Sequence, residues 1–473
     1  MTTSTRDSCN ACSTITSIPP EILSHIHTYL EPADIISLRK TCKHLFDATS
    51  QRSVWTDALQ RVCTFSGLFL PSFTMEKMST QQLEKAAFAP RLFESKVMAN
   101  NPENFLQPFR VRVLEPRFAS EDIGQFRAFK VVPGGRYLVT DCERAIVFWD
   151  LAVTPPSPLA SLPSKSDAMS TMEFGPTTDG RGVLVFVIEE QDGLYTDLTV
   201  YAIYPSSQTP EFTRIASLNH LMIGAFDMTA RTSTDTLLVL LYWGMATIWN
   251  FKDNRIITLH APEGACDIAV FEGYLLIFQP DRFSLYVIPP LRQRHEGDRL
   301  LASVLDQYHP LAEFAYPSGS PYSKIYLAEA SWFPKRNNRQ IFGFSATDDR
   351  DKTILNYYVG GAAGTPGLRM IPVLASSSNS TRLPERHGPL YMAFCNERIA
   401  QIWSTGPRLS IILGSVPTQP GTGNGVAGAF KSAALGQFDR GYLMAYGFSP
   451  ATGRLCVMTS PHGIRIIDYL PPF

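Results

Sequence analysis

The spacing of apolar and polar positions changes once along the chain. Between residues 18 and 62, apolar side chains recur every three or four positions, which places them on one face of a short α-helix. Four such segments follow one another, and Pro20 and Pro32 stand at the first turns of the first two, where proline is tolerated. From about residue 105 onward, short apolar runs alternate with Gly, Pro, Asp and Asn. The pattern therefore predicts a small all-α module followed by a large all-β domain.

The β-rich part repeats one unit of short strands. The unit is clearest at residues 126–151, where two strands flank a Pro133-Gly134-Gly135 turn and a third strand ends in Trp149-Asp150. Seven units of about 50 residues each favour a seven-bladed β-propeller, with one unit per blade. The units lie at 126–151, 171–204, 226–250, 267–288, 328–359, 390–413 and 444–469.

The last unit ends on its third strand, so a propeller would need an outer strand from elsewhere. Residues 109–114 precede the first unit and are expected to supply that strand and close the ring. Insertions at 154–166, 376–389 and 417–428 blur the spacing, so six or eight blades remain alternatives. Two packed sandwiches are the other all-β possibility, but they leave the repetition unexplained.

Two further segments complete the division of the chain. Residues 1–17 are polar and are predicted to form a disordered tail. Residues 63–104 are predicted to form a helical connector, because Ser79 and Gln82 have the spacing of a capping box, although Pro90 is expected to interrupt the helix. The connector either fixes the angle between the helical module at 18–62 and the β domain at 105–473, or is a linker without that role.

The helical module also resembles a known family. The run Ile18-Pro19-Pro20-Glu21-Ile22-Leu23, the later apolar positions and the pair Val54-Trp55 resemble the F-box, the module that docks substrate receptors onto the Skp adaptor of SCF ubiquitin ligases. Two positions depart from the family pattern: Ile18 stands where Leu is usual, and Leu45 where many members have Trp. The resemblance implies a Skp-binding face made of Ile18, Pro19, Ile22, Leu23, Leu30, Leu38, Val54 and Trp55.

Pro19 and Trp55 are predicted to be the main anchors of that face, because a buried Trp is a frequent interface anchor. The alternative is that these residues only pack the helical module itself. The unit at 126–151 resembles a blade of a WD-repeat propeller, although only Trp149-Asp150 has the signature ending and the chain has no Gly-His dipeptide.

Composition narrows the class of protein. The chain of 473 residues has 42 Lys and Arg against 43 Asp and Glu, and 44% of its residues are hydrophobic. This balance excludes a chain that stays unfolded and argues against a basic protein that coats nucleic acid. The longest apolar stretch, at 237–249, is interrupted by Gly244 and is too short for a spanning helix, so no membrane contact is expected.

The charge is unevenly distributed along the chain. Residues 331–473 carry a net charge of +7 and residues 1–330 a net charge of -8. A positive surface on the late strand units would attract an acidic or phosphorylated peptide, and Arg suits phosphate best. The alternative is scattered, solubilising charge. The candidate substrate-binding residues are Arg336, Arg339, Arg369, Arg408, Arg440 and Arg454.

Motifs for chemistry are weak. The G-x-G-x-x-G match at 423–428 follows Pro417-Thr-Gln-Pro420 instead of a strand, so a loop is predicted there. Cys9-x-x-Cys12 lacks a second pair for a metal. We therefore predict no catalytic residue, no metal and no cofactor.

These observations predict the substrate-recognition subunit of an SCF-type ligase in the cytoplasm or nucleus. The module would bind Skp and through it the cullin-RING ligase, and the propeller would bind a protein target, so the subunit itself would be non-catalytic. A scaffold that binds Skp without promoting degradation and a propeller enzyme are the alternatives.

Overall fold

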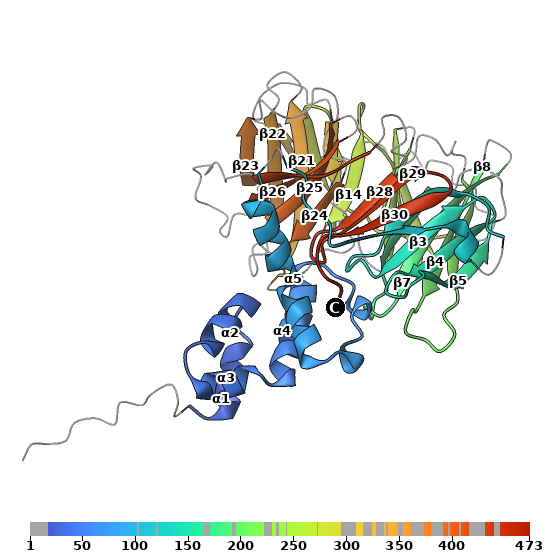
Figure 1. The fold of residues 1–473 in the computed structure, drawn as a ribbon. Helices are drawn as coiled ribbons and strands as arrows, with labels where there is room; N and C mark the ends of the chain where they lie inside the picture. The colour runs from blue at the N-terminus through green and yellow to red at the C-terminus, as the bar shows by residue number, and fades with distance from the viewer. Residues whose placement is uncertain are drawn as a thin grey trace, which may run out of the picture.

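A computed structural model describes most of the chain, and in it a cluster of helices stands against one side of a larger body of β-sheets (Figure 1). The described residues are 18–101, 104–119, 122–164, 171–191, 195–221, 229–232, 236–242, 244–271, 273–294, 309–315, 324–327, 335–336, 339–348, 353–360, 373–379, 391–395, 398–405, 408–415, 431–438 and 445–473. The predicted tail at 1–17 lies outside them.

Among the described residues, the α-helices all precede the strands. Five α-helices are α1 Pro20–His27, α2 Pro32–Arg39, α3 Lys43–Thr49, α4 Arg52–Phe65 and α5 Thr80–Ala99. Short 3-10 turns are η2 Leu70–Ser72, η3 Met75–Lys77 and η4 Pro116–Phe118. Helices α1 to α3 have seven or eight residues each, so they depend on packing for stability.

The described strands form seven separate antiparallel sheets. Three sheets are β2 Phe126–Val131, β3 Tyr137–Cys142, β4 Ala145–Asp150 and β5 Ser157–Pro163; β6 Thr171–Pro176, β7 Val183–Gln191, β8 Tyr195–Ile203 and β9 Thr213–Leu221; and β10 Thr229–Thr232, β11 Leu237–Tyr242, β12 Met245–Asn250, β13 Arg255–His260 and β17 Arg292–Gln293.

The other four sheets complete the body. They are β14 Asp267–Phe271, β15 Tyr274–Phe278, β16 Arg282–Val287 and β18 Ala312–Ala315; β19 Lys324–Leu327, β21 Arg339–Asp348, β22 Thr353–Gly360 and β23 Val373–Asn379, with β20 Lys335–Arg336 beside β21; β24 Tyr391–Cys395, β25 Arg398–Thr405, β26 Arg408–Ser415 and β27 Lys431–Gln437; and β28 Ala445–Ser449, β29 Arg454–Ser460 and β30 Gly463–Asp468 with β1 Arg110–Leu114.

The sheets are arranged around their first strands, as in a β-propeller. β28 contacts both β24 and β2, β24 also contacts β19, and β10 contacts both β6 and β14. Lys130 on β2 and Glu173 on β6 form an ion pair of 2.7 Å, which joins these two first strands to each other. Each sheet contains strands from one of the repeat units recognised in the sequence. Separate small sheets whose first strands contact one another exclude the two-sandwich alternative.

Strand β1 closes the ring, as the sequence predicts. It pairs antiparallel with β30, from Arg110 opposite Asp468 to Leu114 opposite Ile464. The strand that precedes the first sheet is therefore the outermost strand of the last one. This pairing joins the two ends of the β domain and covers the edge that β30 would otherwise expose.

Helix α5 corrects one expectation. Ser79 caps it as predicted: its Oγ accepts a hydrogen bond from the Gln82 backbone N–H at 3.3 Å, and the Gln82 Oε1 accepts one from the Ser79 backbone N–H at 2.8 Å. Pro90, however, lies inside a continuous helix and does not interrupt it. Pro90 is buried, and packing on both sides of the helix offsets the hydrogen bond that proline removes.

The two halves of α5 belong to different cores. Leu83, Ala86 and Ala87 pack with Trp55 and Leu59 of α4 in the core of the helical module. The C-terminal half instead packs between the sheet of β24–β27 and the sheet of β28–β30, through Ala89, Phe93 and Val97.

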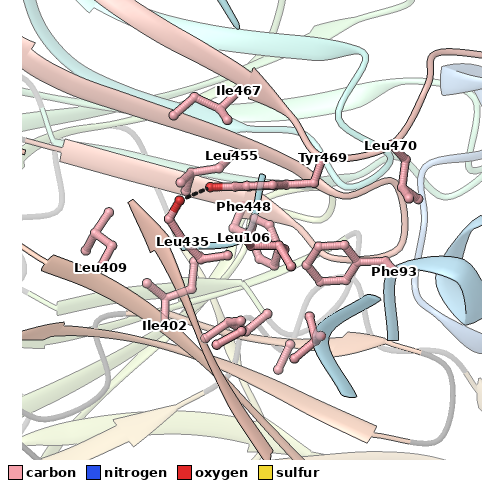
Figure 2. Packing of buried hydrophobic residues seen from close by; sticks show 14 of the residues in the cluster. Phe93, Leu106, Ile402, Leu409, Leu435, Phe448, Leu455, Ile467, Tyr469 and Leu470 are labelled. Atoms are coloured by element: carbon pink, nitrogen blue, oxygen red, sulfur yellow. Dashed lines mark hydrogen bonds between the residues drawn. The ribbon is translucent and has the colours of Figure 1, made fainter. Parts of the chain in front are cut away.

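Phe93 is the centre of the contact with the propeller. Its ring lies 5.5 Å from that of Phe448 and 6.3 Å from that of Tyr469, measured between centroids, and Figure 2 shows these rings gathered where α5 meets the sheets. The Tyr469 hydroxyl donates a hydrogen bond of 2.5 Å to the Leu435 carbonyl, and Lys96 Nζ donates one of 2.9 Å to the Tyr469 carbonyl. The contact is therefore apolar at its centre and hydrogen-bonded at its margin.

A second contact joins the connector to the first sheet. The Phe69 N–H donates to the Pro133 carbonyl at 3.0 Å, and the Tyr137 hydroxyl donates to the Pro71 carbonyl at 3.3 Å. Gly134 in this turn has a φ of 101°, and a Cβ there would lie 2.7 Å from Ser72. Glycine is therefore needed both for the backbone conformation and for the close approach. The two contacts together fix the connector on the propeller.

We predict that Phe93→Ala destabilises the protein strongly. Phe93 is fully buried, so truncation removes apolar contacts and leaves a cavity, with an expected loss of about 3 to 5 kcal/mol in the free energy of unfolding. Urea unfolding followed by circular dichroism measures it. Leu92→Ala is the matched control on the same helix, because Leu92 is 41% exposed and its truncation should change stability by about 0.5 kcal/mol or less. Equal effects of the two variants would contradict the assignment.

Candidate functional site

The helices α1 to α3 form the end of the molecule that lies away from the sheets (Figure 1). Proline at the first turn starts both α1 and α2, and neither helix has a side-chain cap. Each of these helices is too short to bury a full stripe, so several apolar side chains stay at the surface. This surface is the candidate binding face.

Five of the eight residues predicted to bind an adaptor are accessible. Pro19 is exposed and Ile22 is 51% exposed, whereas Ile18, Leu30 and Leu38 are half-buried. Ile18 and Pro19 precede α1, Ile22 lies on α1, Leu30 lies between α1 and α2, and Leu38 lies on α2. These residues can contribute apolar contact area to a partner.

The other three are buried, which corrects their assignment to the binding face. Leu23 is 1% exposed, Val54 is 4% exposed and Trp55 is completely buried. Trp55 Nε1 donates a hydrogen bond of 2.8 Å to the Thr49 carbonyl, so its one polar atom is also satisfied internally. These side chains build the module, because α4 faces α5 and a surface that packs inward on α5 cannot also face a partner.

Arg39 links the module to the connector around Trp55. Its guanidinium carbon lies 5.2 Å from the Trp55 ring centre, and its Nη1 donates to Glu84 Oε2 of α5 at 2.8 Å. The Arg39 side chain is 18% exposed, so solvent screens this pair only in part. The ion pair ties α2 to α5 and keeps the candidate face in a fixed position relative to the connector.

Sequence reasoning missed two exposed aromatic residues. Tyr29 is 77% exposed and Phe46 is 51% exposed, although both lie among the apolar positions of the helical module. Phe46 follows Leu45, and α3 buries Leu45, which is 1% exposed, while it leaves Phe46 at the surface. Tyr29 comes after the last residue of α1. Leu45, where many F-box sequences have Trp, therefore acts in the core of the module.

A cleft of about 440 Å³ lies beside this face, where the α1–α2 turn meets α4 and α5. Its walls include Tyr29, Leu30, Phe65 and Pro90. Leu30 is one of the predicted adaptor contacts, so the cleft continues the candidate face toward the connector. Glu31, Arg61 and Arg91 also line the cleft, so its walls are both apolar and charged, as is common where protein partners bind.

Arg61 and His27 hold the end of α1 next to this cleft. Arg61 donates hydrogen bonds to the His27 carbonyl at 2.8 Å and to the Leu30 carbonyl at 3.0 Å. It therefore satisfies carbonyls that the helix end leaves free. His27 is 3% exposed, and burial, with a smaller contribution from the Arg61 charge, lowers the pKa of its imidazole below 6.5.

The arginines predicted to bind a substrate lie in different structural environments. Arg454 is a structural residue, which corrects its assignment to substrate binding: Nε donates to Asp468 Oδ1 at 2.5 Å, and Nη1 donates to the Gly135 carbonyl at 2.6 Å. Arg408 is half-buried and its guanidinium carbon lies 5.3 Å from the Phe105 ring centre.

The remaining candidates are placed only in part. Arg336 and Arg339 are opposite each other in the hairpin of β20 and β21. Arg369 and Arg440 lie outside the described residues, as do Cys9, Cys12 and the glycine-rich run at 423–428.

Two searches of the described part of the chain concern other kinds of site. No group of three or more His, Cys, Asp or Glu side chains there could hold a metal ion. None of the helices there combines the length and the apolar character that crossing a membrane requires.

Comparison with known proteins gives one family-model match, and it covers the N-terminal module. Residues 15–61 match the family model for F-box-like modules. No curated protein sequence matches the chain. The F-box-like match covers helices α1 to α3 and most of α4, and it indicates a Skp-type partner for the N-terminal module.

Solved structures similar to the chain include several propellers. The β-propeller domain of Cps50 (Swd1) from Myceliophteria thermophila is 12% identical, with a TM-score of 0.47 over 78% of this chain and 99% of that one. The WD40 domain of SCAP from fission yeast is 11% identical, with a TM-score of 0.41 over 73% and 84%. The C-terminal WD40 domain of Sif2 is 10% identical, with a TM-score of 0.43 over 78% and 99%.

We predict that acid loosens α1 through His27. The imidazole has a lowered pKa when folded, so on acidification the unfolded chain binds the proton first. The stability that neutral His27 contributes is present above pH 6.5 and is lost as the pH falls below that value. Hydrogen–deuterium exchange of the full-length protein, corrected for intrinsic rates, should show α1 less protected at about pH 5.5 than at about pH 7.5.

His27→Leu should remove this difference, because it removes the buried titratable group. His25→Leu is the matched control, since His25 lies on the exposed side of the same helix. A loss of pH dependence in the His25 variant and not in the His27 variant would refute the assignment.

Proposed function

We propose that this protein, an F-box-like module joined to a β-propeller, is a substrate-recognition adaptor of an SCF-type ubiquitin ligase. The module binds a Skp adaptor and through it a cullin-RING ligase, and the propeller binds a protein target. The protein contributes no catalytic group of its own. It acts in the cytoplasm or the nucleus, where these ligases act.

The observation that carries the proposal is the shared burial of α5. One helix belongs to the core that supports the candidate binding face and also to the core of the propeller. A target on the propeller is thus held in a fixed orientation to anything bound at α1 to α3. Holding two reactants in a fixed relation raises their effective concentration, which is what a ligase needs from a receptor.

The accessible residues define the proposed Skp contact. Ile18, Pro19, Ile22, Leu30 and Leu38 remain from the family pattern, and the exposed aromatic rings of Tyr29 and Phe46 extend it. Aromatic side chains with a large exposed area are frequent interface anchors. Trp55 supports this face from inside the module.

We predict that Ile22→Glu weakens binding of purified Skp adaptor at least about ten-fold, because it places a charge in an apolar interface. Isothermal titration calorimetry with the full-length protein measures this. Leu92→Glu is the control, since it changes an apolar residue of similar exposure on α5, away from the candidate face, and should leave the affinity unchanged. The proposal is wrong if wild-type protein does not bind the adaptor.

Assembly with a cullin distinguishes the ligase from a scaffold. Reconstitution of the protein with Skp, cullin and the RING subunit should give a stable complex that depends on Ile22. Skp binding without cullin assembly would instead identify a non-degradative scaffold.

A further inference from the structure

Strand β1, which closes the propeller, has a free edge. It is the outermost strand of its sheet and pairs with β30 on one side only, among the residues that the structure describes. Backbone N–H and C=O groups on an edge strand can pair with another chain. Natural proteins commonly protect such edges with charged side chains.

The exposed face of β1 is apolar instead of charged. Phe109, just before the strand, is 57% exposed, and Val111 and Val113 are 52% and 44% exposed. Alternate residues of a strand point to the same side of the sheet, so these three side chains form one stripe. A free edge with an apolar stripe is suited to bind a further strand.

The opposite face of β1 is positively charged. Arg110 Nη2 lies 3.1 Å, and Arg112 Nη2 3.5 Å, from Asp468 Oδ2. Arg454 Nε donates to the other oxygen of the same carboxylate at 2.5 Å. Three guanidinium groups therefore share one carboxylate, which leaves an excess of positive charge beside the edge.

Arg112 is the buried member of this cluster and adds positive charge behind Arg110. Its side chain is 9% exposed, and its Nη1 donates to the Leu151 carbonyl at 2.8 Å, whereas Nε and Nη2 donate no hydrogen bond within the described part of the chain. Burial, followed by the charges of Arg454 and Arg110, lowers the pKa of the Arg112 guanidinium. An additional anionic group near Arg110 would offset this repulsion.

Another sheet of the same propeller shows that an outer edge accepts an extra strand. β13 is the fourth strand of its sheet, and β17 adds to its outer edge as a fifth, with Ile256 opposite Arg292. The addition is short and comes from the same chain. At β1, the described residues supply no such strand.

We propose that the free edge of β1 binds an extended segment of a partner protein in which apolar residues alternate with acidic ones. The apolar side chains would cover the stripe of Phe109, Val111 and Val113, and the acidic side chains would lie beside Arg110, whose side chain is 33% exposed. The backbones would pair as adjacent strands. This site is separate from the α1–α3 face and does not depend on the ligase proposal.

A synthetic peptide tests the proposal. Fluorescence anisotropy would measure binding of the full-length protein to a short labelled peptide of alternating valine and glutamate. We expect saturable binding, and binding at least about ten-fold weaker when lysine replaces glutamate. N-methylation of alternate backbone nitrogens should abolish binding in one register and be tolerated in the other, since only one edge of the peptide pairs with β1.

Variants locate the peptide on β1. The double variant Val111→Glu and Val113→Glu should lose at least about ten-fold in affinity. Ile215→Glu is the matched control, because Ile215 is 46% exposed on β9, the outer strand of another sheet. This variant should bind the peptide as the wild-type protein does. Arg110→Gln should reduce the difference in affinity between the glutamate peptide and the lysine peptide.

Several outcomes would overturn the proposal. They are absence of peptide binding, equal binding by the β1 and β9 variants, or equal tolerance of both N-methylation patterns. Sedimentation equilibrium gives a further one: a wild-type dimer that Val113→Glu converts to monomer would show that the edge binds a second copy of this chain. Skp affinity measured on the same variants separates failure here from failure of the ligase proposal.

Discussion

The burial of α5 in two cores is the constraint on which the geometry of the molecule depends. Leu83 and Ala87 complete the core of the helical module, and Phe93 and Val97 complete a core between two sheets of the propeller. Full burial of an apolar side chain of this size contributes about 1.5 to 3 kcal/mol. A rotation of the module that exposed Phe93 and Val97 together would therefore cost several kcal/mol. Few molecules would adopt such an orientation, so the two ends act as one body.

This constraint separates residues that make the body from residues that are available to partners. Trp55 and Val54 face α5 and are used in the interior, whereas Ile22, Tyr29 and Phe46 are left at the surface because α1 and α3 are too short to bury both sides. In the propeller, ring closure uses one edge of β1, and no described strand pairs with the other edge. Both candidate binding surfaces, the α1–α3 face and the edge of β1, thus lie where no other described element packs.

Much of this arrangement could be predicted from the spacing of apolar residues. The repeat of short strands located the sheets, and the unpaired last strand pointed to residues 109–114 as the closing strand, because an unpaired edge must be covered. Periodicity could not decide which side of each short helix faces inward, since that depends on the position of α5. The sequence therefore places Trp55 on the partner-binding face, whereas the structure buries it. Pro90 misled for the same reason: local propensity predicts a break, and tertiary packing overrides it. Arg454 was taken for a ligand-binding residue because sequence does not show its partner Asp468.

The order in which the chain is synthesised gives the closing strand another significance. Arg110 and Asp468 are 358 positions apart, so β1 can pair with β30 only after the intervening sheets have been translated. The propeller-facing half of α5 also pairs late, because Phe448 lies in the last sheet along the chain and Tyr469 directly follows it. Contacts between such distant positions form slowly. The nascent chain therefore carries Phe93 and the strand at 110–114 without their partners until the last sheet has been translated, and this interval is the one in which a folding chaperone would be needed most.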